Sequence, residues 1–213
     1  MAAVRVRQHV NPLSNKYQIS LQGLEWEKIY TNPHQPLLLD IGCARGKFLL
    51  SMAQLQPEWN FLGLEIREPL VTDAYQWRDK LNLTNLHYLF SNTNNPLQEL
   101  LASLPNHVLQ YITIQFPDPW FKKRHAKRRM VQPQLVTEIA EFLIPGGTVF
   151  LQSDIEFLAQ EMCDRFTENS AFFREGDGEW LKENPLPVQT EREIATFNKE
   201  EPVFRAVYKR KLD

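Results

Sequence analysis

Short apolar runs alternate with helical segments along most of this chain, and no other feature of the sequence constrains the fold as strongly. Each unit of run and helix spans about thirty residues, which is typical of parallel strands joined by helices. The apolar runs lie at 37–41, 60–64, 86–90, 109–116 and 148–152, and the helical segments at 47–54, 68–81, 96–104, 133–143 and 155–167. A last alternating run lies at 203–208. The pattern predicts an α/β fold with a mostly parallel central sheet and helices on both faces.

The length and composition are those of an ordinary globular domain. The 213 residues are 43% hydrophobic and 23% charged, which is enough to bury a large core. We expect a single domain over 31–213, preceded by an arm or extension over 1–30. No run approaches the length of a membrane helix, and the beginning of the chain has no apolar signal core, so we expect no membrane partner.

Cysteine and histidine usage predicts neither disulfides nor a metal. Cys43 and Cys163 are the only cysteines and do not form a C-x-x-C pair, which is typical of a reduced, cytoplasmic protein. The five histidines are scattered without the spacing of metal ligands.

Polar side chains fall at or just after the predicted strand ends. In an open parallel sheet the ligand binds at the carboxyl ends of the strands, near the point where the strand order reverses. A set of acids and amides at these ends therefore predicts a binding site there. The residues are Asp40, Glu65, Asn92, Asp118 and Asp154.

The turn 42–46 after the first strand is built for close approach of a ligand. Gly42 and Gly46 let the backbone come near, but the full G-x-G-x-x-G fingerprint for a pyrophosphate is missing. Asp40 would repel a pyrophosphate and attract a cation, and Glu65 could accept both hydroxyls of a ribose. A nucleoside with a cationic tail, such as S-adenosyl-L-methionine, fits both acids. The structural alternative is that Asp40 caps a helix and Glu65 merely ends a strand.

The fourth strand stops at Pro117-Asp118-Pro119-Trp120, and a dense cationic segment follows at 122–129. The two prolines fix the backbone around Asp118 and remove donors that could occupy its carboxylate. This arrangement suits a purine edge held by a carboxylate, with a nucleic-acid backbone held by cations. The alternative is a proline-rich turn before a solvated basic face. Because the formal net charge is −2, the segment indicates one local cationic surface.

The glycine turn, Glu65 and the block 116–131 resemble the bacterial tRNA (guanine-N7)-methyltransferase family, and the resemblance extends from about Leu37 onward. It implies a Rossmann-like class I methyltransferase that transfers a methyl group from S-adenosyl-L-methionine to N7 of the guanine at position 46 of tRNA. The cofactor-binding positions it implies are Asp40, Gly42, Gly46, Glu65, Asn92 and Asp118. Three residues depart from the family: it often has glutamate at Asp40, glycine at Ala44 and aspartate at Asn92.

The resemblance also assigns the substrate side. Asp118 corresponds to the catalytic aspartate, and the substrate-binding residues it implies are Lys122, Asp154, Thr190 and Glu193. Read without the family, Thr190 and Glu193 form the capping box of a helix. We expect Trp120 to serve packing more than stacking. The predicted contacts to the RNA backbone are Lys123, Arg124, Lys127, Arg128 and Arg129.

Two other classes of function stay open at this point. The chain could be a methyltransferase for a small molecule or a protein, in which case the basic segment is ordinary surface. It could also be a non-enzymatic RNA-binding module on a scaffold that has lost its cofactor. A dehydrogenase is less compatible because the glycine fingerprint is incomplete. The sequence leaves open whether the chain is a monomer or a homodimer, and whether residues 1–30 contact RNA.

Overall fold

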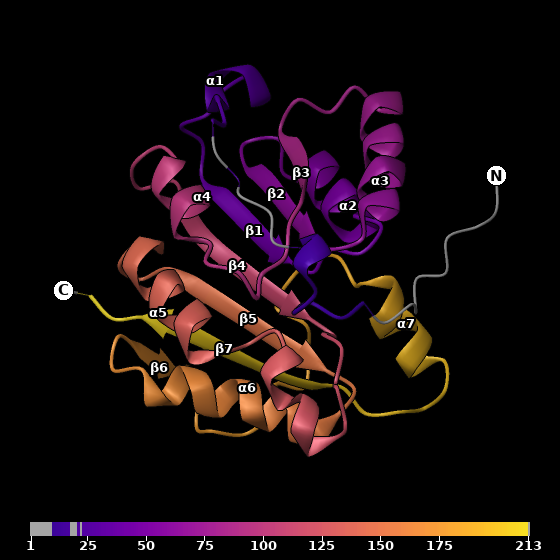
Figure 1. Cartoon of the computed structure of the whole chain (residues 1–213), viewed down its shortest axis with the longest axis vertical. Coiled ribbons are helices and arrows are strands. Elements are labelled where there is room, and N and C mark those ends of the chain that lie inside the picture. Colours follow the sequence, from indigo (N-terminus) through magenta and orange to yellow (C-terminus); the bar gives the residue numbers. More distant parts are fainter. Residues whose placement is uncertain (1–9, 18–20, 22, 213) are drawn as a thin grey trace.

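The computed structural model describes residues 10–17, 21 and 23–212, and within them seven strands form one sheet (Figure 1). The strands are β1 (Leu37–Ile41), β2 (Asn60–Glu65), β3 (Leu86–Phe90), β4 (Leu109–Gln115), β5 (Thr148–Ser153), β6 (Phe172–Arg174) and β7 (Phe204–Arg210). The helices are α1 (Trp26–Ile29), α2 (Lys47–Leu55), α3 (Glu68–Lys80), α4 (Gln98–Ser103), α5 (Pro133–Phe142), α6 (Glu156–Glu168) and α7 (Glu191–Phe197), with 3-10 helices η1 (Asn15–Tyr17) and η2 (Lys123–Arg128).

The strand order is β3-β2-β1-β4-β5-β7-β6, and β1 to β5 are all parallel. The order reverses between β1 and β4, since the chain runs from β1 toward β3 on one side and from β4 toward β5 on the other. This is the switch point at which such folds bind ligands. β7 is antiparallel to both β5 and β6. The predicted α/β fold with a mostly parallel sheet is confirmed.

Each predicted strand and helix lies within two residues of an observed one. The sequence did not predict β6, which has only three residues, or the insertion of β7 between β5 and β6. Residues 1–9, 18–20 and 22 of the predicted extension lie outside the described residues. Trp26 and Tyr30 of the same extension are buried and pack into the main core, so α1 is attached to the sheet. The division at residue 31 stays a prediction.

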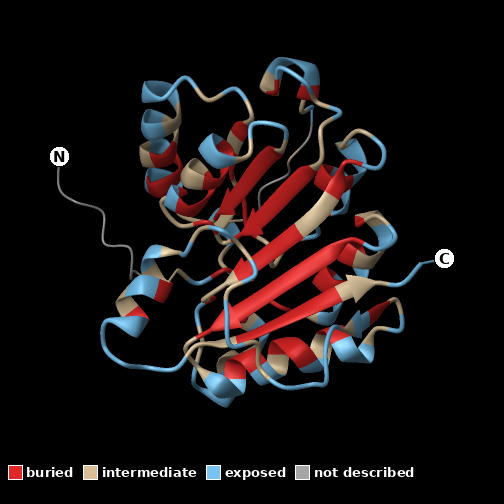
Figure 2. Cartoon of the chain, turned by 180° about the vertical axis from the view of Figure 1, so that it is seen from behind, coloured by how far each residue is buried: buried red, intermediate tan, exposed pale blue. Residues whose placement is uncertain are grey.

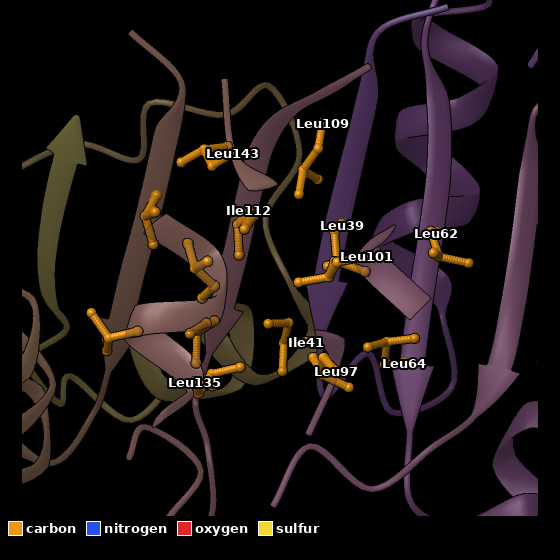
Figure 3. Packing of buried hydrophobic residues seen from close by; sticks show 14 of the residues in the cluster. Leu39, Ile41, Leu62, Leu64, Leu97, Leu101, Leu109, Ile112, Leu135 and Leu143 are labelled. Carbon is orange, nitrogen blue, oxygen red and sulfur yellow. The ribbon is translucent and has the colours of Figure 1, made fainter. Parts of the chain in front are cut away.

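Two hydrophobic layers cover the two faces of the sheet, and β1, β2 and β5 between them are buried along their whole length (Figure 2). Side chains alternate along each strand, so Leu39 and Ile41 face one layer while Leu38 faces the other. The first layer includes α4, α5 and α6, and Leu97, Leu101 and other leucines interdigitate there with the strands (Figure 3). The second layer includes α2 and α3. Because the sheet is packed on both faces, the carboxyl ends of its strands are held in fixed positions.

Candidate functional site

A pocket of about 100 Å³ lies at the switch point, between the loops that follow β1, β2, β3 and β4. Five of the predicted site residues line it: Gly42, Glu65, Asn92, Asp118 and Arg128. The strand alternation therefore brings together residues that lie far apart in the sequence. Asp40, Gly46, Lys122, Asp154, Thr190 and Glu193 do not line this pocket.

The turn after β1 needs its glycines for two different reasons. Gly42 and Gly46 have φ of +88° and +68°, in the left-handed region that favours glycine. A Cβ on Gly42 would come within 2.8 Å of the Met130 side chain, so Gly42 keeps the pocket wall open. A Cβ on Gly46 would come within 2.3 Å of the Tyr88 ring, whose hydroxyl donates to the Gly46 carbonyl at 2.8 Å. Gly46 thus serves packing beneath the turn.

Asp40 is buried beside this turn, where its partners among the described residues are uncharged. It pairs in register with Thr113, whose hydroxyl donates to Asp40 Oδ1 at 2.6 Å, and the Gln115 amide donates to the same oxygen at 3.4 Å. In the part of the chain that the structure describes, Asp40 forms no ion pair. Burial removes water from the carboxyl and raises its pKa from 3.8 to about 6. Asp40 is therefore an anion that lacks a counter-charge at neutral pH.

A hydrogen-bonded array extends from Asp40 across the sheet to α7 and β7. Gln152 donates to Gln115 Oε1 at 2.7 Å and to Glu193 Oε2 at 3.4 Å, and Arg205 donates to Gln152 Oε1 at 3.3 Å. Glu193 is fully buried and forms an ion pair with Arg205 at 2.7 Å. The array connects the predicted cofactor acid with one of the predicted substrate acids through two glutamines.

The capping box predicted at the start of α7 is only half present. The Thr190 hydroxyl accepts from the Glu193 backbone N–H at 3.1 Å, as an N-cap does. The Glu193 carboxylate does not reach back to the cap, because Arg205 and Asn184 hold it. Asp154, which directly follows β5, forms an ion pair with Arg192 of α7. These contacts position α7 over the ends of β5 and β7.

Glu65, which ends β2, is bound by four donors. Its Oε1 accepts from the backbone N–H and Nε of Arg67, and its Oε2 accepts from the Ala44 N–H and from Arg67. A carboxylate offers about four lone pairs, so this set occupies all of them. The negative charge of Asp118 also acts on Arg67. Arg67 therefore lies between the two acids that were predicted to hold the cofactor ribose and the substrate.

The segment 10–17 lies against the other side of the pocket. The side-chain amide of Asn92 donates to the carbonyls of Pro12 at 2.7 Å and of Tyr17 at 3.2 Å. The ring of Tyr17 packs edge-on against Phe90 at 6.4 Å between centroids. Val10 and Pro12 line the pocket wall. The described part of the predicted extension thus contributes to the cofactor end of the site.

The Pro117-Asp118-Pro119-Trp120 loop has an unusual backbone conformation at both ends. Phe116 and Trp120 have φ of +50° and +41°, which is rare for bulky residues and is commonest at functional sites. The Phe116 N–H donates to the Gln152 carbonyl at 2.8 Å, which ties the loop to β5. Asp118 is exposed at its tip. The loop presents one carboxylate to the pocket on a constrained backbone.

Arg129 was predicted to contact the RNA backbone, and the structure places it elsewhere. It is only 8% exposed and forms an ion pair with Glu161 of α6. Its Nε donates to the Pro119 carbonyl at 3.0 Å and another nitrogen to the Trp120 carbonyl at 3.3 Å. The guanidinium thus supplies hydrogen bonds to the loop carbonyls and a counter-charge to Glu161. Arg129 therefore braces the loop, and its predicted contact with the RNA backbone stays a prediction.

The other cations of the segment divide into two groups. Lys122, Lys123, Arg124 and Lys127 are exposed around η2. Arg128 turns toward the pocket, with its guanidinium 5.0 Å from the centre of the Trp120 ring. Its Nε is buried and has no hydrogen-bond partner among the described residues. Trp120 supports the pocket wall through its contact with Arg128 and through its edge-on contact with His125. The exposed group forms a cationic surface next to Asp118.

Comparison with known proteins agrees with this geometry. A family model described as "Putative methyltransferase" matches residues 34–206. The chain is 67% identical over 207 residues to a tRNA (guanine-N(7)-)-methyltransferase of Trichormus variabilis, covering 97% of this chain and 96% of that protein. It is 57% identical to the protein of the same name from a Synechocystis species, covering 99% of each. The chain belongs to the bacterial tRNA (guanine-N7)-methyltransferase family.

Solved structures of other methyltransferases share the fold of this family member. The antibiotic-resistance methyltransferase Kmr matches with a TM-score of 0.61 at 13% identity, covering 92% of this chain and 97% of that one. A putative methyltransferase from Streptococcus mutans, solved in complex with SAH, matches with a TM-score of 0.50 at 12% identity, covering 83% of this chain and 89% of that one. The class I methyltransferase fold is thereby confirmed.

Several residues of the site were not found from the sequence. Arg67 lies two residues after Glu65, and this spacing could have indicated that its guanidinium donates to both oxygens of that carboxylate. Gln115 and Gln152 lie just before Asp118 and Asp154, but nothing in their spacing shows that they touch. Among the described residues, no group of three histidines, cysteines or acids could hold a metal, and no helix is long and apolar enough to cross a membrane. Both cysteines are buried and unpaired.

Proposed function

We propose that this chain transfers a methyl group from S-adenosyl-L-methionine to N7 of guanine in tRNA, at position 46. The observation that carries the proposal is the placement of Asp118. It stands exposed on a constrained loop, at a pocket lined by Gly42, Glu65 and Asn92, and a cationic surface begins four residues later. Proteins that share most of this sequence carry the name of that activity.

The residues at the switch point fit the cofactor. Glu65 would accept the ribose hydroxyls, Asn92 would contact the adenine, and the charge of Asp40, which is buried beside the turn 42–46, would favour a cationic group in the pocket. S-adenosyl-L-methionine provides an activated methyl group when bound. Binding sites for small molecules usually measure about 300–1,000 Å³. The present pocket is smaller, so Arg67 and the segment 10–17, which now hold Glu65 and Asn92, would have to shift.

The substrate side requires orientation and not a strong base. Guanine N7 has a free lone pair and no proton to lose, so catalysis comes from positioning and electrostatics. Asp118 would accept hydrogen bonds from the N1–H and N2 amino edge of guanine, which adenine cannot match. Lys122 and Asp154 lie on the segments that follow β4 and β5 and would contact the same nucleotide. Glu193 is buried, which favours a role in positioning Thr190 and α7.

The exposed cations would contact phosphates. Lys123, Arg124 and Lys127 are exposed on η2, which follows the Asp118 loop, and would hold a tRNA backbone there while the target guanine is unstacked. Arg128 reaches into the pocket and would act closer to the base. We further propose that the protein acts in the cytoplasm, where tRNA is found. Sedimentation of the free protein and of its tRNA complex would distinguish a monomer from a homodimer.

The test is transfer of labelled methyl groups from S-adenosyl-L-methionine to unmodified tRNA, followed by digestion to nucleosides. Label in 7-methylguanosine supports the proposal, and a guanine-46 to adenine change in the tRNA should remove it. Asp118→Ala should abolish transfer while cofactor affinity is retained, and Asp177→Ala, in a distant exposed loop, should behave as wild type. Cofactor binding without labelled tRNA would favour a small-molecule or protein methyltransferase. Absence of cofactor binding would favour an RNA-binding module.

A further inference from the structure

Two phenylalanine rings are exposed next to the Asp118 loop. Phe121, which follows Trp120, is 67% exposed, and Phe157, in the first turn of α6, is 44% exposed. Their ring centres are 5.9 Å apart with an interplanar angle of 55°. Large apolar side chains exposed together usually mark a binding surface. This pair has no role in the core and none in the pocket described above.

Arg129 contacts the Phe157 ring and the backbone directly before Phe121. Its guanidinium lies 5.2 Å from the centre of the Phe157 ring and is paired with Glu161 one turn further along α6. The same guanidinium donates to the carbonyls of Pro119 and Trp120, directly before Phe121. One buried cation therefore fixes the loop and the helix to each other. The two rings are preorganised, so little conformational entropy is lost when a ligand covers them.

The charges around the pair indicate what covers it. Lys122, Lys123 and Arg124 follow Phe121 directly and are exposed, and Asp118 lies three residues before it. A partner that fits must carry flat apolar faces together with closely spaced negative charges. Unpaired nucleotides have this chemistry, since each base has a π-face and each linkage a phosphate. An apolar protein surface would leave the three cations without counter-charges.

We propose that Phe121 and Phe157 form a stacking platform for a nucleobase of the RNA that neighbours the guanine placed at Asp118. The inference rests on the proposed tRNA substrate and extends it to a second base. Removing one guanine from a stack exposes the face of the adjacent base to water. A ring next to the pocket covers that face and stabilises the unstacked form. The platform holds the RNA open, while Asp118 selects the base.

The experiment is a titration of unmodified tRNA with wild type, Phe121→Ala and Phe157→Ala, together with their steady-state kinetics. Each variant should bind tRNA roughly 5- to 100-fold more weakly, which is the usual effect of removing one stacking ring. KM for tRNA should rise in parallel, while affinity for S-adenosyl-L-methionine and Tm stay close to wild type. Phe121→Trp keeps an aromatic face, so it should bind tRNA about as tightly as wild type and more tightly than Phe121→Ala. Phe173→Ala, a 49% exposed ring on β6, is the matched control and should bind normally.

Salt dependence separates stacking from charge. Removing an uncharged ring leaves the slope of log affinity against log salt unchanged, whereas Lys123→Ala should reduce it by roughly one ion. Wild-type tRNA affinity in both phenylalanine variants would overturn the platform and leave the methyltransferase proposal intact. So would loss of self-association in Phe121→Ala with tRNA affinity unchanged, since the pair would then contact a second copy of the chain. If wild type binds tRNA without methylating it, the proposed function fails, and the titration still decides the stacking.

Discussion

Replacing Asp40 by asparagine should stabilise the unliganded protein and weaken its binding of the cofactor. The pKa of the Asp40 carboxyl is raised from 3.8 to about 6, mainly by burial, with a smaller contribution from the charge of Glu65 and opposed by the hydrogen bonds from Thr113 and Gln115. A raised pKa means that the folded state favours the protonated acid. The stability that this acid contributes is complete below pH 3.8 and is lost as the pH rises to about 6.

The magnitude follows from the difference of about two pKa units. At about 1.4 kcal/mol per unit, keeping Asp40 ionised costs the folded state roughly 3 kcal/mol above pH 7. Asparagine is neutral at every pH, and its carbonyl oxygen can accept the same hydrogen bonds from Thr113 and Gln115. The variant should therefore gain up to about 3 kcal/mol over wild type at pH 8, and about half of that at pH 5, where Asp40 is mostly protonated in the folded state.

Urea unfolding of wild type and Asp40→Asn at pH 5 and pH 8, without ligand, measures this gain. Asp79→Asn removes an exposed carboxylate and serves as the control, with no comparable change between the two pH values. Calorimetric titration with S-adenosyl-L-methionine should show weaker binding by Asp40→Asn, because the buried anion that would attract the positive charge of the cofactor is gone. A variant that is less stable than wild type at pH 8 would refute the desolvation argument. It would mean that hydrogen bonding to the ionised carboxylate outweighs its burial.

Two further predictions concern Arg129 and His87. Arg129→Gln should lower the free energy of unfolding by about 1–3 kcal/mol and reduce turnover, because the Pro119 and Trp120 carbonyls lose their donor. The salt slope of its tRNA affinity should stay at the wild-type value, and a reduced slope would return Arg129 to the phosphate contacts. Burial, assisted by the positive charge of Arg78, lowers the pKa of His87 from 6.5 to about 4, so wild type should lose stability as the pH falls through this range. In His87→Gln the loss of unfolding free energy over this pH range should be smaller, by roughly 3 kcal/mol at most. Both proteins carry Asp40, so its opposite pH dependence cancels in the comparison. Parallel curves of unfolding free energy against pH would contradict the reasoning.

The sequence was sufficient for the parallel part of the sheet because each strand there is a short, mostly apolar run between two helical segments, and β1, β2 and β5 are buried along their whole length. It also located the strand-end residues that line the pocket, since the carboxyl ends of parallel strands meet at one edge. β6 was not found because three residues give no period. The position of β7 was not found because the pairing of an antiparallel strand depends on partners far away in the chain.

The site was less predictable wherever one side chain takes another as its partner. Arg129 reads like the other cations of its segment, and only packing shows that it turns inward to Glu161. The sequence predicts Glu193 as a capping residue, but its carboxylate forms an ion pair with Arg205, twelve residues later. The contact of Asn92 with Pro12 joins residues eighty positions apart. Such pairings depend on tertiary geometry that local patterns do not encode.

The hydrogen-bonded array from Asp40 to Arg205 carries two carboxylates, Asp40 and Glu193, but a single guanidinium. Ions from the solvent cannot reach groups buried this deeply, so at neutral pH this array, as far as the described residues form it, carries one negative charge in excess. A ligand that brings a positive charge to the Asp40 end restores neutrality, and its binding free energy then includes the relief of that excess. The folded protein would become more resistant to heat as the concentration of free ligand rises above its Kd. A neutral ligand of the same shape would leave the excess charge in place and protect the fold less.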